Sequence, residues 1–220
     1  VFQKFCQSIF YKICQVSNLK YYGNVYGVAF DNYVENLQDL IYQLKITTIH
    51  VLGQLGYIGH EVVIVKNGMR ICGTGAALGN TPILQNKAYF EVKLQQTGIW
   101  GVGIATRNVN LSKVPLGEDN QSWVLCSNNG IRHNAEEKHR ISESPQEGDI
   151  LGVTFDHVEL NFFINGKSTN TPIIGFKGTI YPVLYVDDGA ILDVVFDNFS
   201  YGPPPGYDAI MIEKSLLEND

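Results

Sequence analysis

The chain has 220 residues, a formal net charge of −6 and an isoelectric point of about 5.3. A length of this order fits one sandwich or barrel domain with an extension. The acidic balance argues against a dedicated nucleic-acid binder, which carries a basic face. The sequence contains neither a polybasic run that would bind an anionic membrane surface nor an apolar stretch long enough to span a bilayer.

Residues 1–58 differ in composition from the rest, since they contain many tyrosines and no arginine. Within them, residues 32–44 place apolar side chains at helical spacing, which predicts about three turns of helix. Two interpretations stay open: a helix docked on a sheet edge, or an irregular, non-native extension. Because the chain starts at Val1 and its first methionine is Met69, we expect a fragment or an incomplete gene model.

From Val62 onward the sequence predicts short strands separated by Gly and Asn. The expected strands are 62–65, 71–73, 88–94, 99–106, 123–126, 131–133, 148–155, 160–164, 179–186 and 191–196. Asn-Gly pairs follow or join several of them, at residues 67–68, 129–130 and 165–166. Asn-Gly favours type I′ hairpin turns, which need positive φ at both central residues. Many short strands with closely spaced turns indicate an all-β sandwich or barrel.

The segment 148–166 is the most informative part of this pattern. Leu151, Val153 and Phe155 share one face of the first predicted strand, and the next strand repeats the alternation at residues 160, 162 and 164. We therefore expect two paired strands with one apolar row in a core. Asp156, His157 and Glu159 fall between them and are expected to be turn residues.

Several characteristic blocks follow one another along the chain: Tyr-Phe-Glu-Val at 89–92, Gly-Ile-Trp-Gly-Val-Gly-Ile-Ala at 98–105, Gly-Asp-Ile-Leu-Gly-Val at 148–153, Asn-Gly at 165–166, Tyr-Pro at 181–182 and Pro-Pro-Pro-Gly-Tyr at 203–207. In this order and spacing, the blocks resemble the SPRY domain family. The resemblance implies an antiparallel two-sheet β-sandwich of the concanavalin A-like type over residues 59–207, followed by a tail at 208–220. It also implies a non-catalytic module that binds a protein or peptide through loops at one rim.

The two segments that line the peptide pocket in such relatives depart here from the family pattern. The first, at 111–117, has no tyrosine, and the second, at 186–189, reads Val-Asp-Asp-Gly in place of Val-Trp-Gly. The relatives' peptide specificity is therefore not expected to carry over. We predict Arg107, Trp123, Asp187 and Asp188 as partner contacts on the rim. The adjacent carboxylates at 187 and 188 leave three options: solvent, a basic or amide-bearing partner, or a calcium ion.

Other chemistry finds little support. The glycine spacing at 73–79 is wrong for a dinucleotide loop, and the sequence has no alternating carboxylates of a glycosidase and no G-x-S-x-G elbow. The mixed-charge stretch 132–140 is expected to be a solvated loop, and Cys72 and Cys126 to be buried free thiols in a reducing cytosol. We expect no enzyme, cofactor or metal site, and a cytoplasmic monomer that binds a protein or peptide. The alternative is a carbohydrate-binding lectin on the same sandwich.

Overall fold

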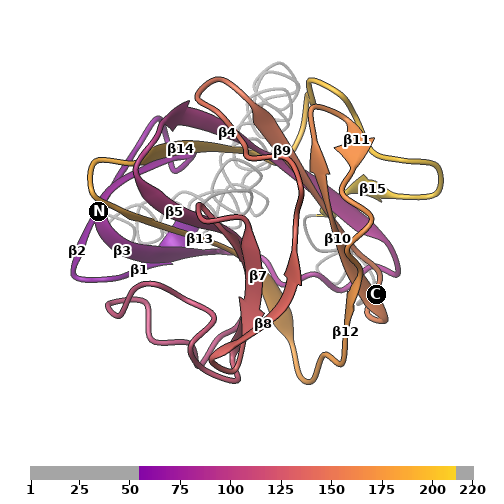
Figure 1. Cartoon of the computed structure of the whole chain (residues 1–220), viewed down its shortest axis with the longest axis horizontal. Coiled ribbons are helices and arrows are strands. Elements are labelled where there is room, and N and C mark those ends of the chain that lie inside the picture. Colours follow the sequence, from indigo (N-terminus) through magenta and orange to yellow (C-terminus); the bar gives the residue numbers. More distant parts are fainter. Residues whose placement is uncertain (1–54, 212–220) are drawn as a thin grey trace, which may run out of the picture. The chain divides into compact units, whose positions relative to one another are not determined.

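The structure is a computed structural model that describes residues 55–211. Two mainly antiparallel sheets face each other, and no helix occurs within these residues (Figure 1). The predicted helix at 32–44 lies outside the described residues. The strands are β1 (Leu55–Ile58), β2 (Glu61–Val65), β3 (Arg70–Gly79), β4 (Ala88–Gln96), β5 (Ile99–Thr106), β6 (Ser122–Cys126), β7 (Gly130–His133), β8 (Glu136–Arg140), β9 (Ile150–Phe155), β10 (Glu159–Ile164), β11 (Lys167–Ser168), β12 (Ile173–Ile174), β13 (Ile180–Asp187), β14 (Ile191–Val195) and β15 (Asp208–Ala209).

The two sheets share the long strand β3. The strands run in the order β11-β10-β9-β4-β14-β3-β13-β5-β6-β7-β8, so the first half of β3 pairs with β14 and the second half with β13. We call the sheet with β13 and β5 sheet A and the sheet with β14 and β4 sheet B. β2 pairs with the sheet B half of β3, and β1 with the sheet A half. The hairpin formed by residues 55–79 therefore folds over one side of the sandwich.

Glycine makes this fold of the hairpin possible. Gly73 and Gly75 have φ of +91° and +129°, and a Cβ at Gly73 would lie 2.4 Å from the carbonyl oxygen of Glu61. Only glycine fits such a backbone conformation at this close approach. Once the hairpin is bent, the amide of Leu55 donates to the carbonyl of Gly68 at 2.9 Å. The glycine-rich run 73–79 is thus a sheet-crossing strand and not a phosphate loop.

The apolar rows predicted for 148–166 are confirmed. Leu151, Val153 and Phe155 of β9 and the facing residues 160, 162 and 164 of β10 are all buried between the sheets. A second apolar cluster lies on the outer face of sheet A, where the loop 107–121 covers β13 and β6 with Val109 and Leu116. Sheet A is therefore buried on both faces over much of its area.

Two expectations about the fold are wrong: Glu159, expected in a turn, begins β10, and the prediction for residues 132–140 also fails. The stretch 132–140 is not a solvated loop: most of it lies in β7 and β8, and β8 forms the edge of sheet A. All five residues of β8 are exposed. An edge strand with water on both faces has no reason to alternate apolar and polar residues, so its sequence resembles that of a loop.

Candidate functional site

A group of polar residues gathers where the bent hairpin meets the β13–β14 turn, at the left of Figure 1. We call this group the turn rim. It comprises His60, Glu61, Thr74, Ser112, Asp187 and Asp188, from four separate places in the chain. The hydroxyl of Thr74 donates to Asp187 Oδ1 at 3.0 Å, and the amide of His60 donates to Ser112 Oγ at 3.2 Å. Glu61 lies opposite Thr74 in the β2–β3 ladder.

The β13–β14 turn presents its carboxylates in a fixed geometry. Asp188 and Gly189 have φ of +47° and +79°, and the amide of Ala190 donates to the carbonyl of Asp187 at 3.1 Å. Positive φ at both central positions matches the right-handed twist of the flanking strands. Asp187 Oδ1 also accepts the amide of Asp188 at 2.8 Å. Thr74 and this amide together orient the Asp187 side chain.

The tip of the loop 107–121 is held against the hairpin bend. The carbonyl of Leu111 accepts the amide of Ala76 at 2.8 Å, and it would lie 2.3 Å from a Cβ placed at Gly59. The close packing of Leu111 against Gly59 fixes Ser112 beside His60. The two segments that the resemblance assigns to a peptide pocket, 111–117 and 186–189, thus both border the bend of residues 55–79.

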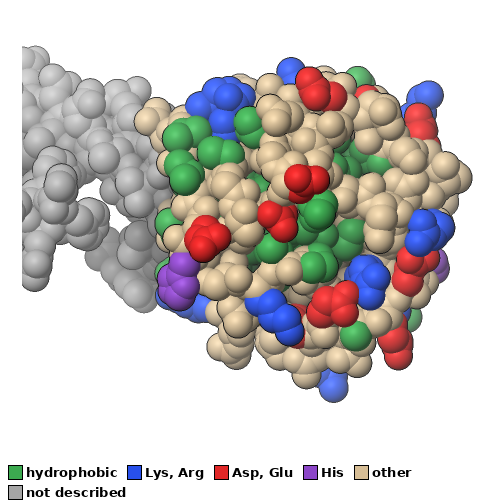
Figure 2. All heavy atoms as spheres, turned by 60° about the vertical axis from the view of Figure 1, so that its left-hand side comes forward, with side chains coloured by type: hydrophobic (Ala, Val, Ile, Leu, Met, Phe, Trp, Pro, Cys, Tyr) green, Lys and Arg blue, Asp and Glu red, His purple; other side chains and the backbone are tan. Residues whose placement is uncertain are grey.

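The charge of the turn rim is not balanced by its surroundings. Within residues 55–211, no Lys, Arg or His side chain lies within ion-pair distance of Glu61, Asp187 or Asp188. Glu61 and Asp188 are exposed and Asp187 is half-buried. Ile99, which pairs with Asp187 across β5 and β13, leaves 42% of its surface exposed. Figure 2 shows acidic side chains standing around exposed apolar ones on this end of the molecule.

Arg107 does not lie on the turn rim. It follows β5 at Thr106, which pairs with Ile180 at the start of β13, whereas Asp187 ends that strand. Because a strand rises about 3.3 Å per residue, the two ends of β13 are about 23 Å apart. The Arg107 guanidinium sits over the Tyr57 ring at 4.0 Å, and hydrogen bonding to Tyr181 raises its pKa above the ordinary value. The expectation of a single rim that includes Arg107 is therefore corrected to two separate locations.

Trp123, predicted from the sequence as a partner contact on the rim, is buried. Its exposed fraction is 3%, and it stacks on His133 with ring centroids 4.3 Å apart. Phe176 packs edge-on against it at 5.2 Å. Burial beneath two rings removes Trp123 from direct contact with a partner. Trp100 is likewise buried, in the core between the sheets.

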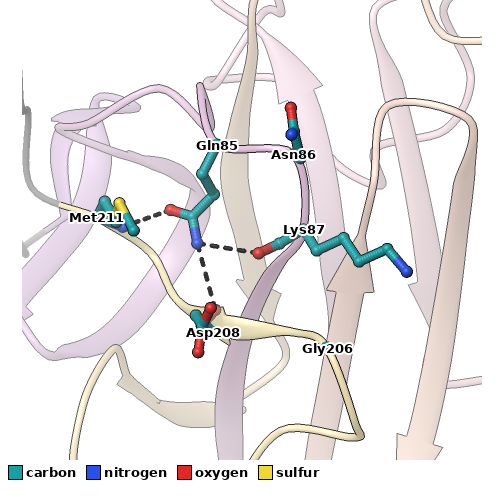
Figure 3. Close-up of a pocket in the computed structure, with 6 residues that line it drawn as sticks. All are labelled: Gln85, Asn86, Lys87, Gly206, Asp208 and Met211. Atoms are coloured by element: carbon teal, nitrogen blue, oxygen red, sulfur yellow. Dashed lines mark hydrogen bonds between the residues drawn. The ribbon is translucent and has the colours of Figure 1, made fainter.

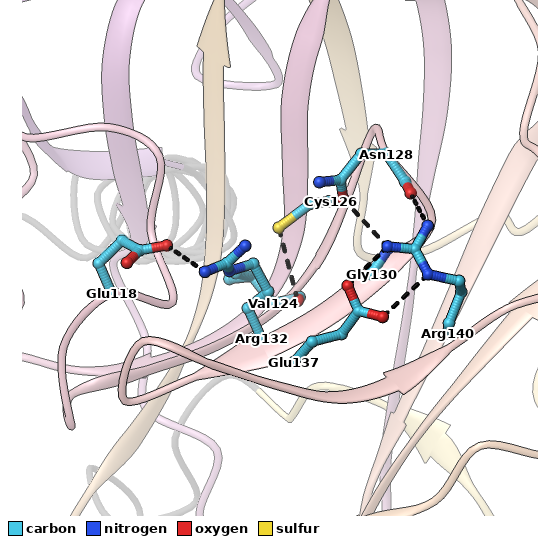
Figure 4. Close-up of polar contacts among 8 residues, drawn as sticks. All are labelled: Glu118, Val124, Cys126, Asn128, Gly130, Arg132, Glu137 and Arg140. Atoms are coloured by element: carbon cyan, nitrogen blue, oxygen red, sulfur yellow. Dashed lines mark hydrogen bonds and ion pairs between the residues drawn. The ribbon is translucent and has the colours of Figure 1, made fainter.

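The arginines of β7 and β8 form ion pairs with nearby glutamates (Figure 4). Arg132 binds Glu118 at 2.8 Å, and the Arg140 guanidinium makes two hydrogen bonds to Glu137. Cys126 is a buried free thiol whose pKa is raised by burial, as expected from its apolar strand. Cys72 is also free but only half-buried. These groups serve the fold at that side of the sandwich.

A shallow hollow of about 520 Å³ lies at the opposite end of the molecule from the turn rim, and Figure 3 shows its lining. The amide nitrogen of Gln85 donates to the carbonyls of Lys87 and Ala209 at 3.0 and 2.8 Å, and its oxygen accepts the amide of Met211 at 2.5 Å. The Lys87 ammonium lies 5.1 Å from the Tyr207 ring centroid. The hollow's central polar groups thus hold β15 against β4.

Neither a metal-ligand cluster nor a membrane-spanning helix occurs within residues 55–211. No three His, Cys, Asp or Glu side chains there are grouped so as to hold a metal ion. The same residues contain no helix with the length and apolar character of a membrane span.

Sequence reasoning missed Thr74 and Ser112. Thr74 is the one polar side chain in the run Gly73–Gly75, and that position was the available signal. Ser112 stands in the segment that the resemblance had marked, but nothing in its own neighbourhood distinguishes it from other loop serines.

Comparisons with known proteins point to one family. The family model for the SPRY domain matches residues 87–199. SPRY domain-containing protein 7 of Homo sapiens and of Mus musculus is 53% identical over 163 residues, covering 73% of this chain and 83% of the relative. The crystal structure of the SPRY domain of human HERC1 gives a TM-score of 0.51 at 16% identity, over 64% of this chain and 97% of that one. The stonustoxin structure gives 0.54 at 14% identity, over 64% of this chain and 26% of that one. At such identities the solved structures show a shared fold.

Proposed function

The chain belongs to the SPRY domain family, and from that premise we propose that it is a non-catalytic protein-interaction module that binds a partner segment at the turn rim. SPRY domains are typically protein-interaction modules. One observation carries the choice of surface: the two segments marked by the resemblance border the same hairpin bend, and the carboxylates beside them have no basic partner within residues 55–211.

The chemistry of the rim favours a partner that donates hydrogen bonds. Asp187 is oriented by Thr74 and by the amide of Asp188, so binding would cost little further ordering of that side chain. Hydrogen bonds to a charged group contribute about 1.5–3 kcal/mol each. Lysine, arginine or an amide side chain on the partner would meet Asp187 and Asp188, and an apolar side chain would cover Ile99. The carboxylates of the rim would repel an acidic partner segment.

The test is a double charge reversal, Asp187→Lys with Asp188→Lys, in the full chain. We expect the variant to lose the proteins that the unaltered chain captures from cell extract, as measured by quantitative mass spectrometry. Its unfolding temperature should stay within a few degrees, because Asp188 is exposed in the turn and Asp187, at the end of β13, is only half-buried.

The matched control is Asp197→Lys with Asp208→Lys, which makes the same change in net charge at two exposed positions away from the turn rim. The control should retain the captured partners. If the two double variants capture the same set, or lose it together, the turn rim is not the partner-binding surface.

A further inference from the structure

Two of the outer edges of the sandwich are protected very differently. β8 ends sheet A and carries Glu136, Glu137, Lys138, His139 and Arg140, all exposed. Its ladder with β7 skips Lys138, which is a β-bulge. Charged side chains and bulges are the devices by which natural sheets prevent another strand from pairing with an edge. β8 is thus closed to further pairing.

β2 is the contrasting edge, in sheet B. Among the described residues it pairs with β3 alone, so its other side offers backbone N–H and C=O groups. Val63 and Val65 point outward, with 52% and 43% of their surfaces exposed. No charged residue interrupts the strand between Glu61 and Lys66. A β-branched row on an unprotected edge is the surface to which an extended peptide adds as a strand.

The unprotected edge is continuous with the turn rim. Glu61 begins β2 and lies opposite Thr74, whose hydroxyl binds Asp187. The three carboxylates without a basic partner therefore stand at the N-terminal end of β2. At the C-terminal end of β2, Lys66 already forms an ion pair with Asp193 at 2.8 Å. The two ends of β2 therefore differ in charge, because only the N-terminal end has carboxylates without a basic partner.

We propose that β2 takes up an extended partner segment as a further, antiparallel strand of sheet B. The segment would carry β-branched or aromatic residues beside Val63 and Val65, and a lysine or arginine at its C-terminal end beside the turn rim. Antiparallel addition brings the C-terminus of the incoming strand to Glu61, and antiparallel pairs are the commoner kind. Cross-strand neighbours of the two valines gain most when they are β-branched or aromatic. This inference rests on the proposed function, because it names the partner of the same surface.

The experiment begins with a phage-displayed library of random dodecapeptides, selected on the immobilised full chain. The expected enriched peptides alternate Val, Ile, Thr, Tyr or Phe over about five positions and end in Lys or Arg. A fluorescein-labelled enriched peptide should bind in an anisotropy titration, and the same residues in reversed order should bind at least tenfold more weakly. Hydrogen exchange should show new protection at residues 61–65 and none at 136–140.

Two variants then separate the edge from the rim. Val63→Lys with Val65→Lys should weaken peptide binding at least tenfold. The control, Val158→Lys with Ile174→Lys, replaces two apolar residues that are even more exposed, and it should leave peptide binding unchanged. If Asp187→Lys with Asp188→Lys abolishes binding and the valine variant retains it, the edge inference is wrong and the proposed function stands. If only the valine variant loses binding, the rim is wrong. Enrichment of peptides without the alternating pattern, or of none, overturns the edge inference.

Discussion

Two groups of carboxylates in this molecule differ in whether the fold supplies their binding partners. Glu91 and Asp193 lie on the outer face of sheet B and have all their partners within the fold, whereas Glu61, Asp187 and Asp188 on the turn rim have no cationic partner among the described residues. The difference teaches which charges hold the domain together and which are left for a partner. Breaking the first group should change stability without changing binding, and breaking the second should do the reverse.

Glu91 offers the largest effect on stability. Its carboxylate is 1% exposed and accepts the amides of Ser200, Tyr201 and Gly202 at 2.7–3.1 Å, together with the hydroxyl of Tyr89 at 2.9 Å. We call residues 198–211 the C-terminal strap, which these bonds fix to β4. Glu91→Gln would place a side-chain NH2 group opposite backbone N–H groups, so that donors face donors. The free energy of unfolding should fall by about 3 kcal/mol. Urea denaturation measures this.

The control for Glu91 is Glu143→Gln, at an exposed position in the loop before β9. It should change the free energy of unfolding by less than about 0.5 kcal/mol. A loss of similar size in both variants, or a loss of partner binding in folded Glu91→Gln, would contradict the division between the two groups.

The hairpin bend that carries the turn rim should respond next. Gly73 and Gly148 have nearly the same φ, +91° and +92°, but a Cβ meets the Glu61 carbonyl at 2.4 Å only at Gly73 and meets nothing within 4 Å at Gly148. Alanine at either position incurs the cost of the left-handed region, roughly 1–2 kcal/mol. Gly73→Ala should lose a further ~1 kcal/mol from the forced backbone shift. Equal thermal unfolding of the two variants would show that the close approach is unimportant.

The ion pairs of Asp193 predict a pH dependence of about 1 kcal/mol. Burial would raise the pKa of Asp193, but hydrogen bonds from Arg70 and Lys66 outweigh it and hold the pKa below the ordinary value. A depressed folded-state pKa contributes stability above the unfolded value of about 3.9, and this contribution is lost as pH falls through the folded pKa.

Asp193→Asn should therefore be less stable than the unaltered chain at pH 7. The difference should shrink as the pH falls from about 5 to below the folded pKa, measured by urea titrations across that range. A constant difference over the range would show that the ion pairs do not stabilise the fold through the charge of Asp193.

Much of the scaffold could be predicted from sequence, because the alternation in residues such as Leu151 and Phe162 reports directly which face is buried. β5 was predicted with its observed bounds, since its apolar run starts directly after Gly98 and ends before the polar residues at 107–108. The site was harder. Period-two patterns give the face of a strand and not the end at which a loop emerges, so Arg107 and Asp187 could be assigned to one rim.

The burial of Trp123 could not be predicted for a related reason. Its burial depends on Phe176 and His133, and Phe176 comes from a distant loop that no local pattern connects with it. β8 could not be recognised because its five exposed residues carry no apolar row. Thr74 and Ser112 reach the rim through the bend of the hairpin, which depends on pairing across two sheets. Local sequence predicts individual strands, whereas the site depends on how strands from distant parts of the chain pair with one another.

The smallest effect on stability should accompany a clear effect on binding, at Asp188. Asp188 and Asn198 both hold positive φ, +47° and +48°, and glycine adopts that region without steric cost. Asp188→Gly and Asn198→Gly should each change the free energy of unfolding by no more than about 0.5 kcal/mol, because the relief of strain is offset by the more flexible unfolded chain. Only Asp188→Gly removes a rim carboxylate, so only it should weaken partner binding, by several-fold in titration. Equal binding by both glycine variants would mean that the Asp188 carboxylate is merely solvated, and Asp187 would then be the single carboxylate of the turn available to a partner.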